Sequence, residues 1–214
     1  MKDATYEMTR RSHDRLAKIW INQPSYFDKS LKDAHTKRFL AHLRKGALVL
    51  DAGCGLGKEA KLLLQNGLRV ISIDISKGML KEARKLVPNG DFRYMDMTRL
   101  SFKDETFDAV WCFSSIHHLR KAEAAKVMKE LNHVLKPNGI LTIAAKEGKG
   151  WYYNVTRQDG KALKRFIKSY TVSSMSEMLA DNGFKLLDIR VQRSKIRPDW
   201  ARVVAVARKS KGRQ

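Results

Sequence analysis

From about residue 47, short apolar runs alternate with segments whose apolar positions recur every three or four residues. Short runs rich in β-branched residues predict strands, and the longer period predicts helices. Strands are predicted over 47–50, 69–73, 92–95, 107–113 and 140–145, and helices over 58–66, 77–86 and 121–135. Such alternation is typical of βαβ units that form a parallel sheet.

The two ends of the chain depart from this alternation. Residues 1–45 are predicted to form an N-terminal helical cap, and the basic, aromatic residues 146–172 a lid or insertion. A helix is expected from Ser173 to about Asn182. Strands over 184–191 and 200–207, joined by a basic turn that contains Pro198, are expected to pair with each other.

Composition narrows the class of protein. Hydrophobic residues make up 43% of the 214 residues and charged residues 30%, which predicts a folded chain with one domain over 1–214. No apolar run reaches the roughly 18 residues of a membrane-spanning helix, and a secretory signal is missing, so we expect a cytoplasmic protein. Cys54 and Cys112 are too few for a disulfide framework, and no metal site is predicted.

The net charge of +21 is concentrated outside the middle of the chain. Residues 46–145 carry a surplus of only +4, whereas residues 1–45, 146–172 and 185–214 together carry +19. A surplus of this size favours a polyanionic partner such as RNA. The alternatives are a well-solvated surface with no such partner and, less favoured because no segment pairs a basic face with an apolar stripe, attraction to a membrane surface.

A glycine loop follows the first predicted strand. Gly53, Gly55 and Gly57 allow a tight turn and the approach of a ligand to main-chain N–H groups at the next helix. Asp74 ends the second predicted strand, where a carboxylate can accept hydrogen bonds from both ribose hydroxyls. Asp51 would repel a pyrophosphate but suits a ligand with an ammonium group.

Further motifs complete a recognisable order over roughly residues 45–145. They are Val49-Leu50-Asp51-Ala52-Gly53-Cys54-Gly55-Leu56-Gly57, Asp74, Asp96, Phe107-Asp108-Ala109-Val110, His117-His118-Leu119 and Lys136-Pro137-Asn138-Gly139. Together they resemble the class I S-adenosylmethionine-dependent methyltransferases, in particular the methyltransferase type 11 group. The resemblance implies an α/β, Rossmann-like three-layer sandwich with a seven-stranded, mostly parallel sheet of order 3-2-1-4-5-7-6, an antiparallel last strand and S-adenosyl-L-methionine as cofactor.

The resemblance also assigns roles around the cofactor. Gly53 and Gly55 would line its methionine part, and Asp74 its ribose. Ile75 would contact the adenine face, and Asp96 the adenine amino group. The full set of implied cofactor positions is Asp51, Gly53, Cys54, Gly55, Gly57, Asp74, Ile75, Asp96, Met97, Phe113 and Ser114. Asp51 is alternatively a structural carboxylate, and Asp96 a turn residue before Thr98.

Candidate residues for the methyl acceptor follow the fourth and fifth predicted strands. His117 and His118 are candidate catalytic or substrate-binding groups, because histidine exchanges a proton near neutral pH. Aromatic and cationic side chains of the insertion are suited to stack a base and hold phosphates, or to close a small-molecule pocket. These predicted substrate residues are Lys146, Trp151, Tyr152, Tyr153, Lys164 and Arg165.

Three functions remain in competition. The leading hypothesis is methyl transfer to RNA, most plausibly tRNA, with some similarity to methyltransferases that esterify a carboxymethyl group on wobble uridine. The alternatives are a small-molecule N- or O-methyltransferase with a basic surface, and a non-catalytic RNA-binding module that keeps the fold. The expected partner is accordingly RNA or a small anionic molecule, with the chain as a monomer or a homodimer.

Overall fold

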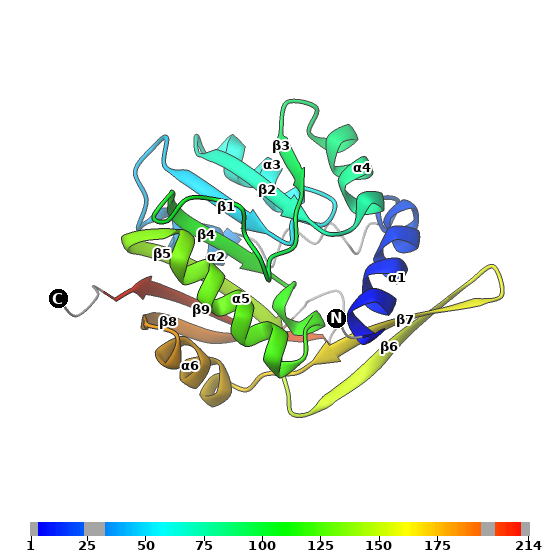
Figure 1. The fold of residues 1–214 in the computed structure, drawn as a ribbon. Helices are drawn as coiled ribbons and strands as arrows, with labels where there is room; N and C mark the ends of the chain where they lie inside the picture. Colours follow the sequence, from blue (N-terminus) through cyan, green and yellow to red (C-terminus); the bar gives the residue numbers. More distant parts are fainter. Residues whose placement is uncertain (1–3, 24–32, 194–199, 211–214) are drawn as a thin grey trace.

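A computed structural model of the chain describes residues 4–23, 33–193 and 200–210 (Figure 1). Its centre is a seven-stranded sheet of order β3-β2-β1-β4-β5-β9-β8. The bounds are β1 Leu48–Ala52, β2 Arg69–Asp74, β3 Asp91–Tyr94, β4 Phe107–Phe113, β5 Leu135–Lys146, β8 Phe184–Arg193 and β9 Ala201–Lys209. Strands β3, β2, β1, β4 and β5 run parallel to one another. Strand β9 is antiparallel to both of its neighbours, β5 and β8. Counted without the separate strands β6 and β7, this order is the predicted 3-2-1-4-5-7-6.

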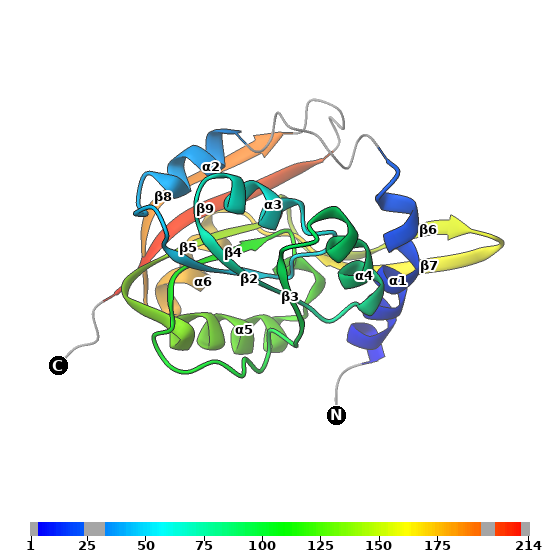
Figure 2. The ribbon, with the colours of Figure 1, turned by 90° about the horizontal axis from the view of Figure 1, so that it is seen from above.

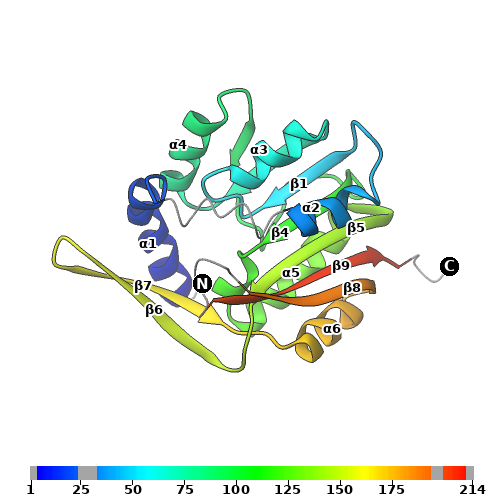
Figure 3. The same cartoon turned by 180° about the vertical axis from the view of Figure 1, so that it is seen from behind.

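Helices cover both faces of the sheet, as Figures 1 and 3 show from opposite sides. Helices α2 (Asp33–Leu40), α3 (Lys58–Gln65) and α4 (Lys77–Leu86) cover one face, and α5 (Lys121–Val134) and α6 (Val172–Asp181) cover the other. Because side chains alternate along a strand, Leu50 and Val110 pack in the α5 and α6 core, whereas Val49 and Ala109 pack in the α2 to α4 core. The α/β three-layer class is therefore confirmed.

Local capping explains two helix boundaries that the sequence predicts correctly. The Ser76 hydroxyl accepts a hydrogen bond of 3.1 Å from the Met79 N–H at the start of α4. Gly67, just beyond α3, has the left-handed φ of 76° that glycine adopts without strain. Strand β5 differs from the prediction, because it begins at Leu135 and includes the Pro137-Asn138-Gly139 turn as an irregularity, with a register shift opposite Phe107–Ala109.

The predicted lid or insertion is a β-hairpin, a form that the prediction above does not specify. Strands β6 (Trp151–Gln158) and β7 (Lys161–Lys168) pair antiparallel and extend beyond the main body (Figures 1 and 2). Asp159 and Gly160 at the tip have φ of 47° and 70°, the left-handed values of a two-residue hairpin turn. At the base, a bridge between Glu147 and Tyr170 brings the two ends of the insertion together.

The N-terminal helix α1 (Ala4–Trp20) joins the hairpin to the main body. Its Thr9 hydroxyl accepts a hydrogen bond from Phe166 N, and its Ser12 hydroxyl donates one of 2.6 Å to the Lys164 carbonyl. On its other side, Asp14 accepts hydrogen bonds from the Ser76 hydroxyl and Gly78 N, at the start of α4. Helix α1 therefore spans from α4 to β7 over the carboxyl ends of the strands (Figure 2).

Two further observations concern the described ranges. No helix there is both long enough and apolar enough to cross a membrane. The predicted turn around Pro198 falls outside the described residues.

Candidate active site

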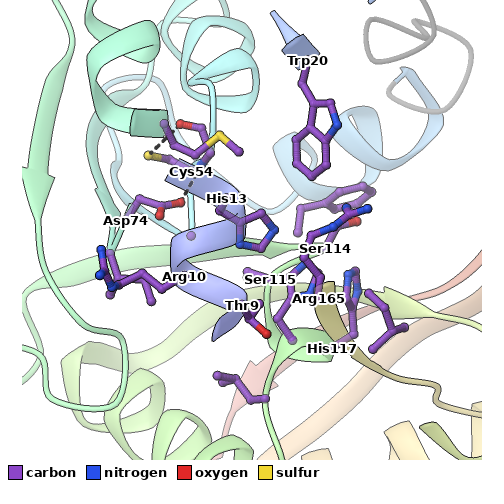
Figure 4. A pocket seen from close by; sticks show the side chains of 18 of the residues that line it. Thr9, Arg10, His13, Trp20, Cys54, Asp74, Ser114, Ser115, His117 and Arg165 are labelled. Carbon is purple, nitrogen blue, oxygen red and sulfur yellow. Dashed lines mark hydrogen bonds between the residues drawn. The ribbon is translucent and has the colours of Figure 1, made fainter. Parts of the chain in front are cut away.

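A cavity of about 420 Å³ lies at the carboxyl ends of the central strands, beneath α1 and the hairpin (Figure 4). Its lining comes from α1, the glycine loop, the ends of β2 and β4, the hairpin and the start of β9. The lining residues used below are Tyr6, Arg10, His13, Trp20, Gly53, Cys54, Gly55, Glu59, Asp74, Ile75, Met79, Met97, Phe113, Ser114, His117, His118, Asn154, Thr156, Arg165, Ile167, Trp200 and Arg202. A volume of this size is typical of small-molecule sites.

The glycines of the loop have different tasks. Gly53 has a φ of 79°, and a Cβ there would lie 2.4 Å from the Ser115 Cβ, so only glycine allows the loop to pack against the end of β4. Gly55 lines the cavity. Gly57 does not, and a Cβ there would lie 2.8 Å from the Phe92 ring. Gly57 therefore has a packing role in this structure.

Asp74 is held rigidly at the end of β2. One carboxylate oxygen accepts a 2.9 Å hydrogen bond from Gly55 N, and the other accepts one of 2.8 Å from Ser76 N. Burial raises the pKa of Asp74, and these two backbone donors oppose that shift. A carboxylate has more acceptor positions than these donors occupy, so Asp74 is able to accept further hydrogen bonds from a ligand.

Two predicted cofactor carboxylates lie elsewhere. Asp51 is only 1% exposed and is not part of the cavity lining. Asp96 is also outside the lining, and one of its oxygens accepts hydrogen bonds from the Tyr6 hydroxyl, at 2.7 Å, and from Thr98. Tyr6 does line the cavity, so Asp96 adjoins the site through this tyrosine.

The glycine-loop end of the cavity fits the cofactor that the resemblance implies. Asp74 offers a carboxylate for two ribose hydroxyls, while the side chains of Ile75, Met79 and Met97 supply apolar surface for a flat adenine ring. Cys54 also lines this end. Burial raises the pKa of its thiol well above the ordinary value, so it is a neutral group here.

Three histidines gather at the other end. His118 lies between His13 of α1, with ring centroids 4.6 Å apart, and His117, at 4.4 Å. Figure 4 shows Asp74 and Cys54 on one side of His13 and Ser114, Arg165 and His117 on the other. The cavity therefore has a carboxylate end and a histidine end.

Hydrogen bonds set the tautomers of the paired histidines. The Phe166 carbonyl lies 2.9 Å from His118 Nδ1, and because a carbonyl only accepts, Nδ1 carries the proton and Nε2 is an acceptor. His117 Nδ1 accepts from Lys146 N at 3.2 Å, so its proton is on Nε2. Burial lowers the pKa of His118 to about 4 and that of His117 well below normal, so both rings are neutral at pH 7.

Two arginines complete the histidine end. Arg165 of β7 donates to the side-chain oxygens of Asn154 and Thr156, at 3.1 and 3.0 Å. Arg202 of β9 donates to the Ser114 hydroxyl at 2.8 Å. Both guanidinium groups line the cavity.

Most of the predicted substrate residues lie outside the cavity. Trp151, Tyr152 and Tyr153 are 62%, 38% and 40% exposed, and Trp151 stacks on Phe166. Lys164 is exposed on β7, next to the buried Arg165. Lys146 places its ammonium 5.1 Å from the centre of the Trp200 ring. Of that predicted set only Arg165 is a lining residue.

Several lining residues escape prediction from the sequence. His13 and Trp20 come from α1, Asn154 and Thr156 from β6, and Arg202 from β9. Among these residues only Asn154 and Thr156 have a sequence signal. Side chains alternate along a strand, so these two lie on the same face of β6. The described residues contain no cluster of three potential metal ligands.

Comparison with known proteins supports the interpretation of this site. Residues 50–143 match the family model of a methyltransferase domain. The chain is 31% identical over 169 residues to a candidate methyltransferase of Encephalitozoon cuniculi. This match covers 72% of this chain and 78% of the relative. It is 39% identical over 106 residues to the 2-methyl-6-phytyl-1,4-hydroquinone methyltransferase of Synechocystis sp., covering 48% of this chain. That match spans only 33% of the relative's length.

A solved structure has the same fold over nearly the whole chain. It is the 1,6-didemethyltoxoflavin-N1-methyltransferase of Burkholderia thailandensis, crystallised with 1,6-didemethyltoxoflavin and S-adenosylhomocysteine. The two share 20% identity with a TM-score of 0.77, over 99% of this chain and 92% of the other. The family match and the relative from E. cuniculi, together with the glycine loop and Asp74, show that the chain belongs to the class I methyltransferases that use S-adenosylmethionine.

Proposed function

We propose that the protein transfers a methyl group from S-adenosylmethionine to an oxygen or nitrogen atom of a small acceptor bound at the histidine end of the cavity. One observation carries this proposal: His118, with Nε2 as its acceptor atom, lines the same cavity as Asp74 and the glycine loop. The methyl acceptor is therefore held next to the cofactor.

The cofactor supplies a methyl group activated by a sulfonium, and the protein provides binding and alignment. Asp74 and the Gly53 to Gly55 loop hold the cofactor end. The His118 Nε2 accepts a hydrogen bond from the acceptor, and the rings of Trp20 and Trp200 bound the space in which it lies. Such positioning is the main contribution required for an in-line displacement.

The names of the relatives support a small acceptor. One matched protein is named for a hydroquinone and another for a toxoflavin precursor. Both are ring compounds, and an aromatic-lined cavity suits a flat ring. RNA, the leading expectation from the sequence, has no support from these names.

The test is to incubate the protein with radiolabelled S-adenosylmethionine and separate pools of metabolites, RNA and protein. We expect label in the metabolite pool. His118→Gln should lower kcat at least tenfold while the affinity for S-adenosylhomocysteine stays unchanged, and His42→Gln, at an exposed position, is the control. Label in none of the pools, or an unaffected His118→Gln variant, would refute the proposal.

A second candidate, methyl transfer to RNA, is favoured by the outer face of the hairpin. There Trp151 and Tyr153 are exposed, and Val155 lies opposite Lys164. Exposed rings beside cations suit base stacking and phosphate binding. The double variant Arg157→Glu with Lys164→Glu tests this without touching the cavity, because both residues are exposed and neither lines it. Weaker RNA binding and a salt slope lower by about two would support this candidate; an unchanged slope would eliminate it.

A further inference from the structure

The paired histidines use only one nitrogen of each ring to hold themselves in place. Both His117 and His118 line the cavity. His117 turns its Nδ1 toward Lys146 N, and His118 turns its Nδ1 toward the Phe166 carbonyl. Within the described part of the chain, these two contacts are the hydrogen bonds that the rings make. The two Nε2 atoms are therefore the polar groups that the pair offers to a bound molecule.

These two Nε2 atoms have opposite roles. Nε2 of His117 carries a proton and donates, whereas Nε2 of His118 has a lone pair and accepts. The rings lie side by side, with centroids 4.4 Å apart and planes inclined at 64°. One donor and one acceptor are thus presented by adjacent rings in the wall of the cavity.

The main chain prevents either role from being reversed. A carbonyl cannot donate and a main-chain N–H cannot accept, so a change of tautomer would leave polar groups without a partner. His117 is only 2% exposed, which makes such a loss costly. Lys146 lies on β5 and Phe166 on β7, and both follow residue 143, where the family match ends. The groups that set the pattern therefore lie outside the matched region.

Hydrogen bonding, and not charge, is what this pair contributes. Burial lowers the pKa of both histidines, so the rings are neutral at pH 7. Charged side chains of other described residues line the cavity as well, and they are Arg10, Lys58, Glu59, Asp74, Arg165 and Arg202. Because the histidine donor and acceptor are uncharged, their pattern does not depend on the balance of these charges.

A complementary ligand has an acceptor and a donor next to each other. A hydroxyl group does not require this pattern, because its proton rotates and either arrangement of the rings would satisfy it. The edge of a cyclic amide, in which an N–H adjoins a C=O, has one fixed direction. Its N–H would donate to His118, and its C=O would accept from His117. The rings of Trp20 and Trp200 border the same cavity and suit a flat ring.

We propose that the methyl acceptor is a flat, uncharged heterocycle with a lactam edge, an N–H beside a C=O, bound by His117 and His118. This inference rests on the proposed function and names the substrate class. The lactam N–H provides the hydrogen bond to His118 that the proposed function requires. A ring that lacks either group leaves one histidine nitrogen unpaired and binds less tightly.

Calorimetry on the protein saturated with S-adenosylhomocysteine tests the proposal. The probes are 2-pyridone and 2-quinolone, each paired with the lactone of the same shape, 2-pyrone and coumarin, in which oxygen replaces the N–H. Phenol and 1-naphthol test a hydroxyl instead. We expect at least one lactam to bind tenfold or more tightly than its lactone and than the hydroxy compound of the same size. Lactones or hydroxy compounds that bind as well as the lactams, or no lactam that binds, would overturn the proposal.

Two asparagine variants each remove one Nε2 and keep the main-chain contact. The shorter amide reaches the position of Nδ1, where it is able to accept from Lys146 N in His117→Asn or donate to the Phe166 carbonyl in His118→Asn. His118→Asn should reduce the preference for lactam over lactone to within twofold. His117→Asn should weaken both compounds at least tenfold and keep the preference, because both have the C=O.

A control and a second readout separate binding from folding. His42→Asn, at an exposed position, should change nothing, and both test variants should bind S-adenosylhomocysteine within twofold of the wild type. Nitrogen NMR of the histidine rings at pH 7 should show a protonated Nε2 in His117 and an unprotonated Nε2 in His118. The reverse tautomers, or a lactam preference that survives in His118→Asn, would refute the assignment.

The outcomes distinguish this inference from the proposed function. If label from S-adenosylmethionine enters only metabolites without a lactam edge, the protein is a small-molecule methyltransferase but the lactam proposal is wrong. If no pool is labelled, the proposed function fails whatever the calorimetry shows, because binding is measured without methyl transfer.

Discussion

The Tyr6 hydroxyl donates a hydrogen bond of 2.7 Å to Asp96, ninety positions further along the chain. This bond connects the first turns of α1 with the loop after β3. Asp14, two turns further along the same helix, accepts hydrogen bonds from Ser76 and Gly78. The helix that covers the cavity is therefore attached to the same loops that would hold the adenosine part of the cofactor.

Removal of the Tyr6 hydroxyl should loosen this cover. Tyr6→Phe leaves the ring in place but breaks a hydrogen bond to an acidic group, a loss of about 1–2 kcal/mol. We expect S-adenosylhomocysteine to bind several-fold more weakly, and the amides of α1 to exchange faster with deuterium. Tyr94→Phe, at an exposed ring, is the control. Equal exchange in both variants would contradict a role for this bond.

Asp74 is the main polar anchor that we expect for the ribose. Asp74→Ala should weaken S-adenosylhomocysteine binding by about 1–3 kcal/mol, because two hydrogen-bond acceptors are lost. Calorimetry measures the effect, and Asp91→Ala, on the exposed start of β3, is the matched control. An unaltered affinity in Asp74→Ala would show that the ribose lies elsewhere.

The buried histidines should make the fold sensitive to mild acid. The pKa of His118 is about 4 in the folded chain against an ordinary value of 6.5, and the pKa values of His13 and His117 are also lowered by burial. Between pH 6.5 and 4 the unfolded state therefore binds protons that the folded state does not, and stability falls as the pH falls. Urea unfolding should show a loss on the order of a few kcal/mol from pH 7 to pH 5, with a shallower slope in His118→Gln. Parallel slopes for that variant and the wild type would exclude His118 as a source.

Gly57 offers a test of packing against backbone freedom. Gly57→Ala places a methyl group 2.8 Å from the Phe92 ring at a φ of 76°, whereas Gly160→Ala has a φ of 70° and no atom within 4 Å. Both variants should lose about 1–2 kcal/mol from the left-handed backbone. Only Gly57→Ala should lose a further free energy of unfolding of about 1–3 kcal/mol, which is the cost of overpacking. This additional loss should appear as a lower Tm. Equal Tm values would argue against the clash.

The hairpin is proposed to act as a lid. Thr9 and Ser12 of α1 hold it by hydrogen bonds and Trp20 packs against its Arg165, while its tip at Asp159-Gly160 extends from the body (Figure 3). Limited proteolysis should cut near the tip, at Arg157 or Lys161 with trypsin, and S-adenosylhomocysteine together with an acceptor should slow the cut. The same rate with and without ligands would count against a lid.

The central sheet could be predicted well because its signals are local. Apolar runs, the Ser76 cap and the glycine loop each depend on residues that are close in the chain. The acceptor end could not be predicted in the same way, since His13, Arg165 and Arg202 meet only through tertiary packing. Trp151, Tyr152 and Tyr153 do not line the cavity, and Trp151 and Tyr153 lie on the face of β6 opposite to Asn154 and Thr156.

The hairpin was missed for a different reason. Asp159-Gly160 is a recognisable two-residue turn signal, but the three lysines and the arginine on β7 hide the alternation of apolar positions there. Leu163 and Ile167 are buried although each is followed by a lysine. The turn dipeptide is therefore the one local signal in this segment that indicates two paired strands.

The base of the hairpin closes the inserted segment on itself. Tyr170 N donates to the Lys146 carbonyl at 2.8 Å and Gly148 N donates to the Tyr170 carbonyl at 3.1 Å, so the inserted segment leaves and rejoins the sheet at one point. A segment whose ends already touch can be lengthened, shortened or exchanged at little cost to the framework. A change in the length of residues 148–169 therefore leaves the path of β5 and of the chain that enters α6 unaltered, and its cost falls on the contacts between the hairpin and α1.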